Sequence, residues 1–155
     1  MSIKFYNTLT NKVENFTSIE KNKISMYICG VTPYDVVHLG HARAYVTFDV
    51  IKRHFIRSGY SVNHIQNFTD VDDKIINKAN EEKIDEVVIA QRYIDAYELV
   101  RNSLNVKAPN VTPRVTENMD EIIAFIKRLI DEGYAYNIDG DVYFRVTKIK
   151  DYGQL

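Results

Sequence analysis

A buried strand, a tight turn and a long helix follow one another early in the chain, and this order constrains the fold more than any other feature. The run from Ile24 to Ile28 is apolar enough for a strand buried in a sheet. The turn follows at residues 32–35, Thr-Pro-Tyr-Asp, because proline fixes φ and aspartate favours local backbone hydrogen bonds. Strand, loop and helix make the first half of a βαβ unit, whose ligands bind at the carboxyl ends of the parallel strands. We therefore expect Cys29, His38 and His41 to lie there together.

The rest of the chain also alternates between strand and helix patterns. On the helix expected at 42–57, four apolar residues recur at spacings of four, three and four and define one face: Ala44, Phe48, Ile51 and Phe55. Two prolines within residues 108–113 predict a linker. The other expected elements are a hairpin of strands at 3–9 and 12–17, a parallel strand at 60–68, a following helix capped by Thr69 or Asp70, helical segments up to residue 99 with a break near 82–84, a helix at 122–130 ended by Gly133, and a hairpin at 134–146.

Composition limits the class of protein. With 155 residues, 45% hydrophobic and 26% charged, the chain suits one globular domain, or one domain and part of another. A net charge of −1 provides no overall basic field that would attract nucleic acid. No apolar run approaches the roughly 20 residues of a membrane-spanning helix. The single cysteine cannot form an internal disulfide, so we expect a reducing, cytoplasmic compartment. We also expect no membrane association and no evident protein partner.

The sequence His-Leu-Gly-His at 38–41 places two imidazoles three residues apart at a helix start. Unpaired amides and the helix dipole make such a start an anion site, and an imidazole there can stabilise charge growing on a phosphoryl group. Gly40 has no Cβ, so a flat base or ribose could lie against its backbone. The alternative is a pair of ordinary histidines, which a four-residue motif taken alone leaves open.

Cys29 and the acidic run after the second strand each have a structural and a chemical interpretation. A lone cysteine at a strand end is either a small buried hydrophobe or one ligand of a zinc site, which needs three or four protein ligands. Asp72 and Asp73 suit helix capping and the helix dipole, and the run lacks the glycine and glutamate of a calcium loop. Thr69, at the end of the second strand, is the better candidate to face a ligand.

Several long motifs in one order resemble the amino-terminal catalytic half of cysteinyl-tRNA synthetase, a class I aminoacyl-tRNA synthetase. They are Met-Tyr-Ile-Cys-Gly-x-Thr-x-Tyr-Asp at 26–35, His-Leu-Gly-His at 38–41, Phe-Asp-Val at 48–50 and Asn-Phe-Thr-Asp-Val-Asp-Asp-Lys-Ile-Ile at 67–76. The similarity extends from Phe-Tyr-Asn-Thr-Leu at 5–9 to Tyr-Gly-Gln-Leu at 152–155. The resemblance implies an α/β fold: the first half of a Rossmann-type parallel sheet with helices over residues 1–110, then the start of an inserted connective α+β domain over 111–155.

The resemblance also implies an activity. The family activates cysteine with Mg-ATP to cysteinyl-adenylate and then transfers the cysteinyl group to the 3′-terminal adenosine of cysteine tRNA. By the same resemblance, His38 and His41 are catalytic, and both bind ATP together with Gly40. Gly30 and Thr69 line the cysteine pocket. Cys29 is the first ligand of the Zn²⁺ that binds the substrate thiolate. Zinc makes chemical sense, because ordinary pocket contacts separate near-isosteres such as cysteine and serine by only about 10²-fold.

The chain departs from the family pattern in what it lacks: the remaining zinc ligands, the Lys-Met-Ser-Lys-Ser loop, the helical tRNA-reading domain and any tryptophan. We therefore expect an amino-terminal piece of the enzyme that is inactive alone and binds zinc poorly. Three alternatives stay open. They are an ATP-dependent cysteine ligase of mycothiol synthesis, a small His-x-Gly-His nucleotidyltransferase complete at this length, and a non-catalytic module that binds a partner or a tRNA end.

Overall fold

The computed structural model describes residues 3–154 of the chain, and these residues group into two compact units. Residues 18–118 form the larger unit. The described residues before and after them form the smaller one. The predicted limits of the catalytic half and of the inserted domain, 1–110 and 111–155, remain a prediction.

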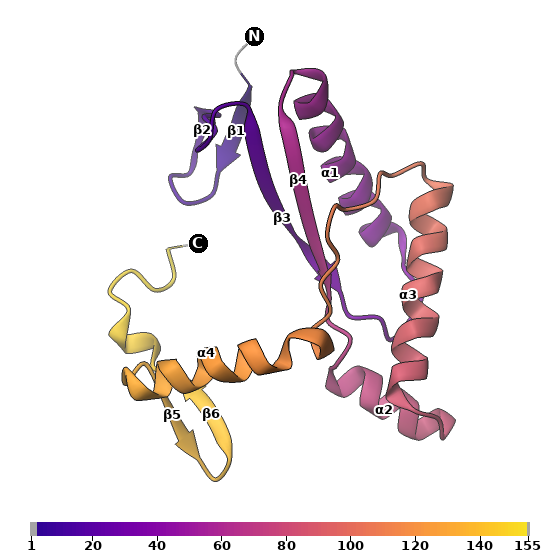
Figure 1. Ribbon diagram of the computed structural model, residues 1–155, viewed down its shortest axis with the longest axis vertical. Coiled ribbons are helices and arrows are strands. Elements are labelled where there is room, and N and C mark those ends of the chain that lie inside the picture. Colours follow the sequence, from indigo (N-terminus) through magenta and orange to yellow (C-terminus); the bar gives the residue numbers. More distant parts are fainter. Residues whose placement is uncertain (1–2, 155) are drawn as a thin grey trace. The chain divides into compact units, whose positions relative to one another are not determined.

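The larger unit is built on a parallel pair of strands with helices packed against them (Figure 1). Strand β3 (Lys23–Val31) leads through a loop into helix α1 (Leu39–Arg57), and strand β4 (Ser61–Phe68) returns parallel to β3. Helices α2 (Asp73–Glu82) and α3 (Glu86–Ser103) follow. The predicted order of strand, turn, helix and parallel strand is confirmed, and it brings the carboxyl ends of both strands to one edge of the sheet.

The predicted linker takes part in the sheet. Two isolated parallel bridges join residues 111–114 to β4. The Gln66 amide donates to the Val111 carbonyl at 3.1 Å, and the Phe68 amide donates to the Pro113 carbonyl at 2.9 Å. Proline has no amide hydrogen, but this segment contributes carbonyls to β4, so its prolines are tolerated at this position.

Helix α1 buries a different face from the predicted one. Its buried residues are Tyr45, Asp49, Lys52 and Phe55. Of the predicted face only Phe55 is buried, whereas Ala44 and Phe48 are exposed and Ile51 is half-buried. The prediction was wrong because it counted apolar residues alone. Buried polar groups are stable where they are hydrogen-bonded, and Asp49 and Lys52 are bonded to backbone groups of the segment after α3.

The predicted cap of helix α2 was also wrong. Asp72 caps this helix, and its side chain accepts a hydrogen bond from the Lys74 amide at 2.9 Å. Asp70 is buried and accepts from the amide and the hydroxyl of Thr116, at 3.1 and 2.5 Å. The structural interpretation of Asp72 is therefore confirmed, while Asp70 ties the end of β4 to the segment that follows residue 114.

Two apolar clusters make the core of the larger unit. The first contains Tyr45, Phe68, Ile94 and Tyr97, and the second contains Ile75, Ala79, Ile89 and Ala90. In the first cluster the Tyr97 ring lies edge-on to the rings of Phe68 and Tyr45, with centroids 5.3 and 4.9 Å apart. The cluster joins α1, β4 and α3, so it fixes the start of α1 relative to the strand ends.

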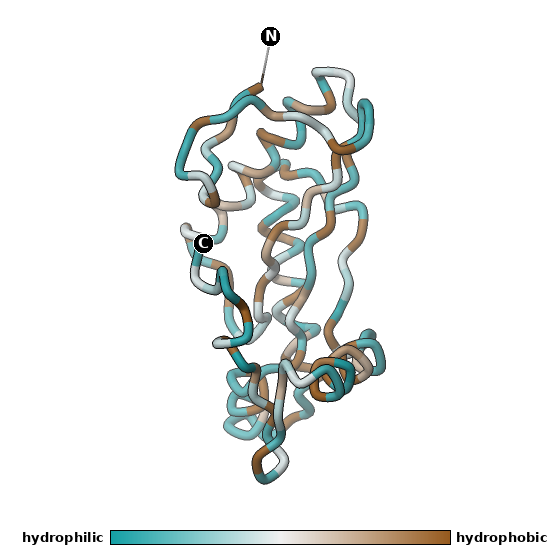
Figure 2. Tube along the Cα trace, turned by 90° about the vertical axis from the view of Figure 1, so that its left-hand side faces the viewer, coloured by the Kyte–Doolittle hydropathy of each residue, from teal (hydrophilic) through white to brown (hydrophobic). Residues whose placement is uncertain are grey.

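The smaller unit contains two antiparallel hairpins and one helix, all of which were predicted. Strands β1 (Lys4–Asn7) and β2 (Lys12–Asn15) form the first hairpin. Helix α4 (Met119–Asp131) precedes the second, made by β5 (Ala135–Ile138) and β6 (Asp141–Phe144). Hydrophobic residues occur in short stretches along the trace (Figure 2), and within residues 3–154 no helix is long and apolar enough to cross a membrane.

Candidate active site at the start of helix α1

Strand β3 ends in a bulge that only glycine permits. Its register with β4 runs from the pair Ile28–Gln66 to the pair Val31–Phe68, so two residues of β3 lie opposite Asn67. These two residues are Cys29 and Gly30. A Cβ on Gly30 would lie 1.6 Å from the Asn67 carbonyl oxygen, which no side chain can accommodate.

The two histidines of the His-x-Gly-His sequence cap helix α1 reciprocally. His38 is the N-cap, and its Nδ1 accepts from the Gly40 amide at 3.1 Å. His41 Nδ1 accepts from the His38 amide at 3.2 Å, and the two ring centroids lie 4.0 Å apart. A neutral imidazole whose Nδ1 accepts carries its hydrogen on Nε2. The capping box therefore selects the same tautomer in both rings and leaves each Nε2–H as a donor.

Gly40 makes room for this arrangement. A Cβ at this position would lie 2.8 Å from Cε1 and 3.0 Å from Nδ1 of His38. The His38 ring thus lies against Gly40, in the space where a base or ribose was predicted to lie. The predicted contact between Gly40 and ATP stays a prediction.

A pocket of about 310 Å³ opens beside the histidines. Its lining includes the loop from Gly30 to His38, together with His41, Lys74 and Tyr97. The Lys74 ammonium lies 5.0 Å from the ring centroid of Tyr34, and both residues line the pocket. Burial, and then the neighbouring His38, lower the pKa of His41 and keep it neutral. The imidazole donors of His38 and His41 and the ammonium of Lys74 together suit a phosphorylated ligand.

The predicted site residues fall into two groups. Gly30, His38 and His41 line the pocket together, whereas Cys29, Gly40 and Thr69 are absent from its lining. The Cys29 side chain is exposed, with Sγ 3.7 Å from the Gly30 carbonyl oxygen. Thr69 pairs through its amide with the Val31 carbonyl at 3.0 Å, which places it beside the end of β3.

The chain by itself offers little for a metal. Within residues 3–154 no group of three or more histidine, cysteine or acidic side chains is placed to hold an ion. The exposed thiol of Cys29 is a donor that zinc accepts, so the residues present fit one ligand of a zinc site. The predicted role of Cys29 as a zinc ligand stays a prediction.

Two amide side chains of β4 contact the Cys29–Gly30 peptide, and sequence analysis missed both. The Gln66 Nε2 donates to the Cys29 carbonyl at 3.2 Å, and the Asn67 Oδ1 accepts from the Gly30 amide at 3.1 Å. The signal was present, since residues 61–68 are more polar than a central parallel strand should be. The polarity has a use, because those side chains bond to the neighbouring strand.

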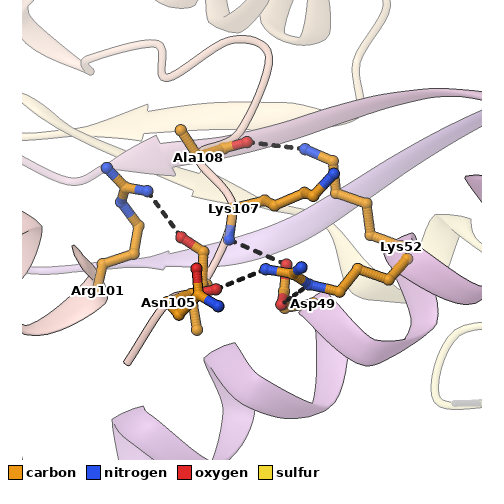
Figure 3. A network of polar contacts seen from close by, with 8 residues as sticks. Asp49, Lys52, Arg101, Asn105, Lys107 and Ala108 are labelled. Atoms are coloured by element: carbon orange, nitrogen blue, oxygen red, sulfur yellow. Dashed lines mark hydrogen bonds and ion pairs between the residues drawn. The ribbon is translucent and has the colours of Figure 1, made fainter. Parts of the chain in front are cut away.

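A polar network anchors residues 105–110 to helix α1 (Figure 3). The buried Lys52 ammonium donates to the Ala108 carbonyl at 2.7 Å, and the Asp49 carboxylate accepts from the Lys107 amide at 3.0 Å. This network explains why the buried face of α1 carries charged residues. It fixes the segment that then runs beside β4.

The ring of His64 lies close to this network and is buried without a hydrogen-bond partner among the described residues. Its side chain faces the covered side of the sheet and is only 5% exposed, and neither ring nitrogen is bonded there. Burial, followed by the nearby Lys52, lowers the pKa of His64, against a smaller opposing effect of Asp49. The ring is therefore held neutral in the folded chain.

Comparison with known proteins gives consistent results. Residues 15–155 match the family described as tRNA synthetases class I (C) catalytic domain. The chain is 53% identical over 155 residues to a cysteine–tRNA ligase of Endomicrobium trichonymphae and 53% identical over 154 residues to one of a Geobacillus species. These matches cover 100% and 99% of this chain but 33% of each relative, so the chain spans about a third of the length of its curated relatives.

Solved structures with a similar fold belong to the same class. A Mycobacterium tuberculosis methionyl-tRNA synthetase in complex with methionyl-adenylate has a TM-score of 0.65 at 21% identity, covering 72% of this chain and 23% of that one. A leucyl enzyme of Agrobacterium radiobacter in a ternary complex has a TM-score of 0.59 at 22% identity, covering 71% and 15%. At these identities the likeness concerns the fold, and it confirms the predicted class I synthetase architecture.

Proposed function

The chain belongs to the family of class I (C) tRNA synthetase catalytic domains, and from this premise we propose that it supplies the histidine-bearing part of the active site of a cysteine–tRNA ligase. In the proposed reaction the carboxylate of cysteine attacks the α-phosphorus of Mg-ATP and pyrophosphate leaves. A ribose hydroxyl of the 3′-terminal adenosine of cysteine tRNA then attacks the carbonyl carbon of the adenylate, so that the cysteinyl ester forms and AMP leaves.

The capping box of His38 and His41 is the observation that supports this chemistry. Both Nδ1 atoms accept backbone hydrogen bonds, so each ring presents its Nε2–H as a donor beside the pocket. Donors held in place before the reaction stabilise negative charge that develops on phosphate oxygens, at no cost of reorganisation. We assign this role to both histidines, and we propose that Gly40, in the first turn of α1, contacts the same ATP.

The amino acid would bind at the carboxyl ends of β3 and β4. Gly30 and Thr69 are proposed to line the cysteine pocket, and Cys29 to provide one ligand of a zinc ion whose other ligands lie outside this chain. Zinc, when bound, would supply a soft contact for the substrate thiolate that the hydroxyl of serine cannot match. Here the part of the chain lies in presenting an exposed thiol at the strand end.

A chimera tests the proposal. This chain would replace the matching third of the Geobacillus cysteine–tRNA ligase, and exchange of pyrophosphate into ATP would be measured with cysteine, serine and methionine. We expect exchange with cysteine alone. The variant His41→Gln keeps a side chain suited to the capping box but loses the imidazole, and should lower kcat about 10²- to 10³-fold.

The matched control is His54→Ala, because His54 is an exposed histidine near the other end of the same helix. It should exchange like the unmodified chimera. Equal rates for His41→Gln and His54→Ala, or exchange that does not depend on cysteine, would contradict the proposal. The chain alone should show neither exchange nor one tight zinc per molecule by metal analysis.

A further inference from the structure

We propose that Gln66 and Asn67 are positioning residues, which hold the peptide between Cys29 and Gly30 from its two ends and so set the direction of the Cys29 side chain and of the Thr69 hydroxyl. The inference rests on the proposed function for its meaning, since these are the residues assigned to the amino acid. The contacts themselves are independent of that assignment.

The bulge creates the need for such a clamp. The paired register of β3 and β4 skips Cys29 and Gly30, so this peptide lies outside the regular ladder. Two side chains of β4 bond to it instead: Gln66 Nε2 to the carbonyl of Cys29 at 3.2 Å, and Asn67 Oδ1 to the amide of Gly30 at 3.1 Å. Both polar groups of one peptide are thus held by neighbouring side chains of one strand.

The Gln66 side of the clamp is anchored in the core. Gln66 is 6% exposed, and its Oε1 accepts from the hydroxyl of Tyr97 at 3.1 Å. Tyr97 is 3% exposed and packs against Phe68. Burial raises the pKa of Tyr97 to about 12, so its hydroxyl remains a donor over the working pH range. Because the Cys29 carbonyl can only accept, the amide nitrogen of Gln66 faces Cys29 and Oε1 faces the Tyr97 hydroxyl.

The Asn67 side links the bulge to Thr69. Asn67 Oδ1 accepts from the hydroxyl of Tyr27 at 2.9 Å as well as from the Gly30 amide, which fixes the orientation of the amide. Its Nδ2 then donates to the Thr69 Oγ1 at 3.3 Å. Because this oxygen accepts from Asn67, the hydroxyl hydrogen of Thr69 remains available to donate to an acceptor such as a sulfur or a carboxylate of a bound amino acid.

The first experiment measures order at the bulge in this chain without substrate. The chain has one cysteine, so labelling with ¹⁵N-cysteine gives a single backbone amide resonance. Its order parameter should be about 0.85 in the unmodified chain and fall toward about 0.6 in Gln66→Met and in Asn67→Ala. Asn63→Ala, an exposed asparagine earlier on β4, should leave it unchanged.

The second experiment separates positioning from stability. In the chimera, Gln66→Met and Asn67→Ala should raise KM for cysteine about tenfold, as the loss of one hydrogen bond permits, and leave KM for ATP unchanged. Asn67→Asp keeps the acceptor for Gly30 but turns the donor toward Thr69 into an acceptor. It should preserve amide order and still raise KM for cysteine.

Each outcome decides the inference. Unchanged order and unchanged KM for cysteine in folded Gln66→Met and Asn67→Ala would overturn it. If either fails to fold, Tyr97→Phe and Tyr27→Phe each remove one anchoring hydroxyl, and wild-type order in both would overturn it as well. A chimera with no cysteine-dependent exchange would defeat the proposed function, yet the order parameters would still decide the clamp.

Discussion

Replacing Gly30 with alanine should separate the two parallel strands at their carboxyl ends. The new Cβ would lie 1.6 Å from the Asn67 carbonyl oxygen, 2.5 Å from its carbonyl carbon and 2.8 Å from Oδ1. Ordinary contact begins near 3.4 Å, so the strands must part by roughly 1.8 Å. Two of the nearest contacts are backbone atoms, which cannot rotate aside as a side chain would.

The cost follows from what that movement breaks. The Gly30–Asn67 bond at 3.1 Å and the Thr69–Val31 bond at 3.0 Å would both be lost. At about 1 kcal/mol for each bond and about 1–3 kcal/mol for overpacking, the free energy of unfolding should fall by about 4 kcal/mol. For a chain of this length that lowers Tm by about 12 °C.

Thermal unfolding followed by circular dichroism measures this, with Gly59→Ala as the control in the same unit. Gly59 has φ of +89° but nothing within 4 Å of the added Cβ, so only the backbone conformation is penalised. That penalty is about 1–2 kcal/mol, or about 4 °C. Equal melting temperatures for the two variants would refute the close approach of Gly30 to Asn67 and the bulge on which it depends.

Variants at three further positions test the other features. His38→Asn should keep the start of helix α1, because asparagine is a strong N-cap, while His38→Ala should lose about 1 kcal/mol in urea unfolding; equal stabilities would contradict the capping role. Because the pKa of His64 is lowered in the folded chain, the stability that its neutral ring contributes is complete above the unfolded pKa near 6.5 and is lost as pH falls below it. In His64→Leu, the free energy of unfolding in urea should therefore change less between pH 6.5 and 5. An unchanged dependence on pH would contradict this. Lys52→Met removes the donor to the Ala108 carbonyl and to Asn110 Oδ1 at 3.4 Å. It should lower the free energy of unfolding by about 1–3 kcal/mol and speed hydrogen exchange of the Asn110 amide. Unchanged exchange would show that the network does not hold this segment.

Predictions from the sequence succeeded where neighbouring residues decide the structure. The strand, the proline turn, the helix after His38 and the hairpins follow from local pattern and turn chemistry. The buried face of α1 does not follow from local pattern, because Asp49 and Lys52 are buried by partners more than 50 residues away. The predicted cap of α2 was wrong for a related reason. Asp70 and Asp72 are equally good caps by residue type, but the Asp70 carboxylate accepts hydrogen bonds from Thr116 instead.

By itself, the sequence determined which elements form and that two imidazoles stand at a helix start after a buried strand, since these depend on spacing along the chain. Only the tertiary structure decided how Gln66 and Asn67 hold the Cys29–Gly30 peptide. The choice depends on the bulge, which shifts the pairing of β3 against β4 by one residue. A register between strands more than 30 residues apart is set by packing of the whole unit, and no local pattern contains it.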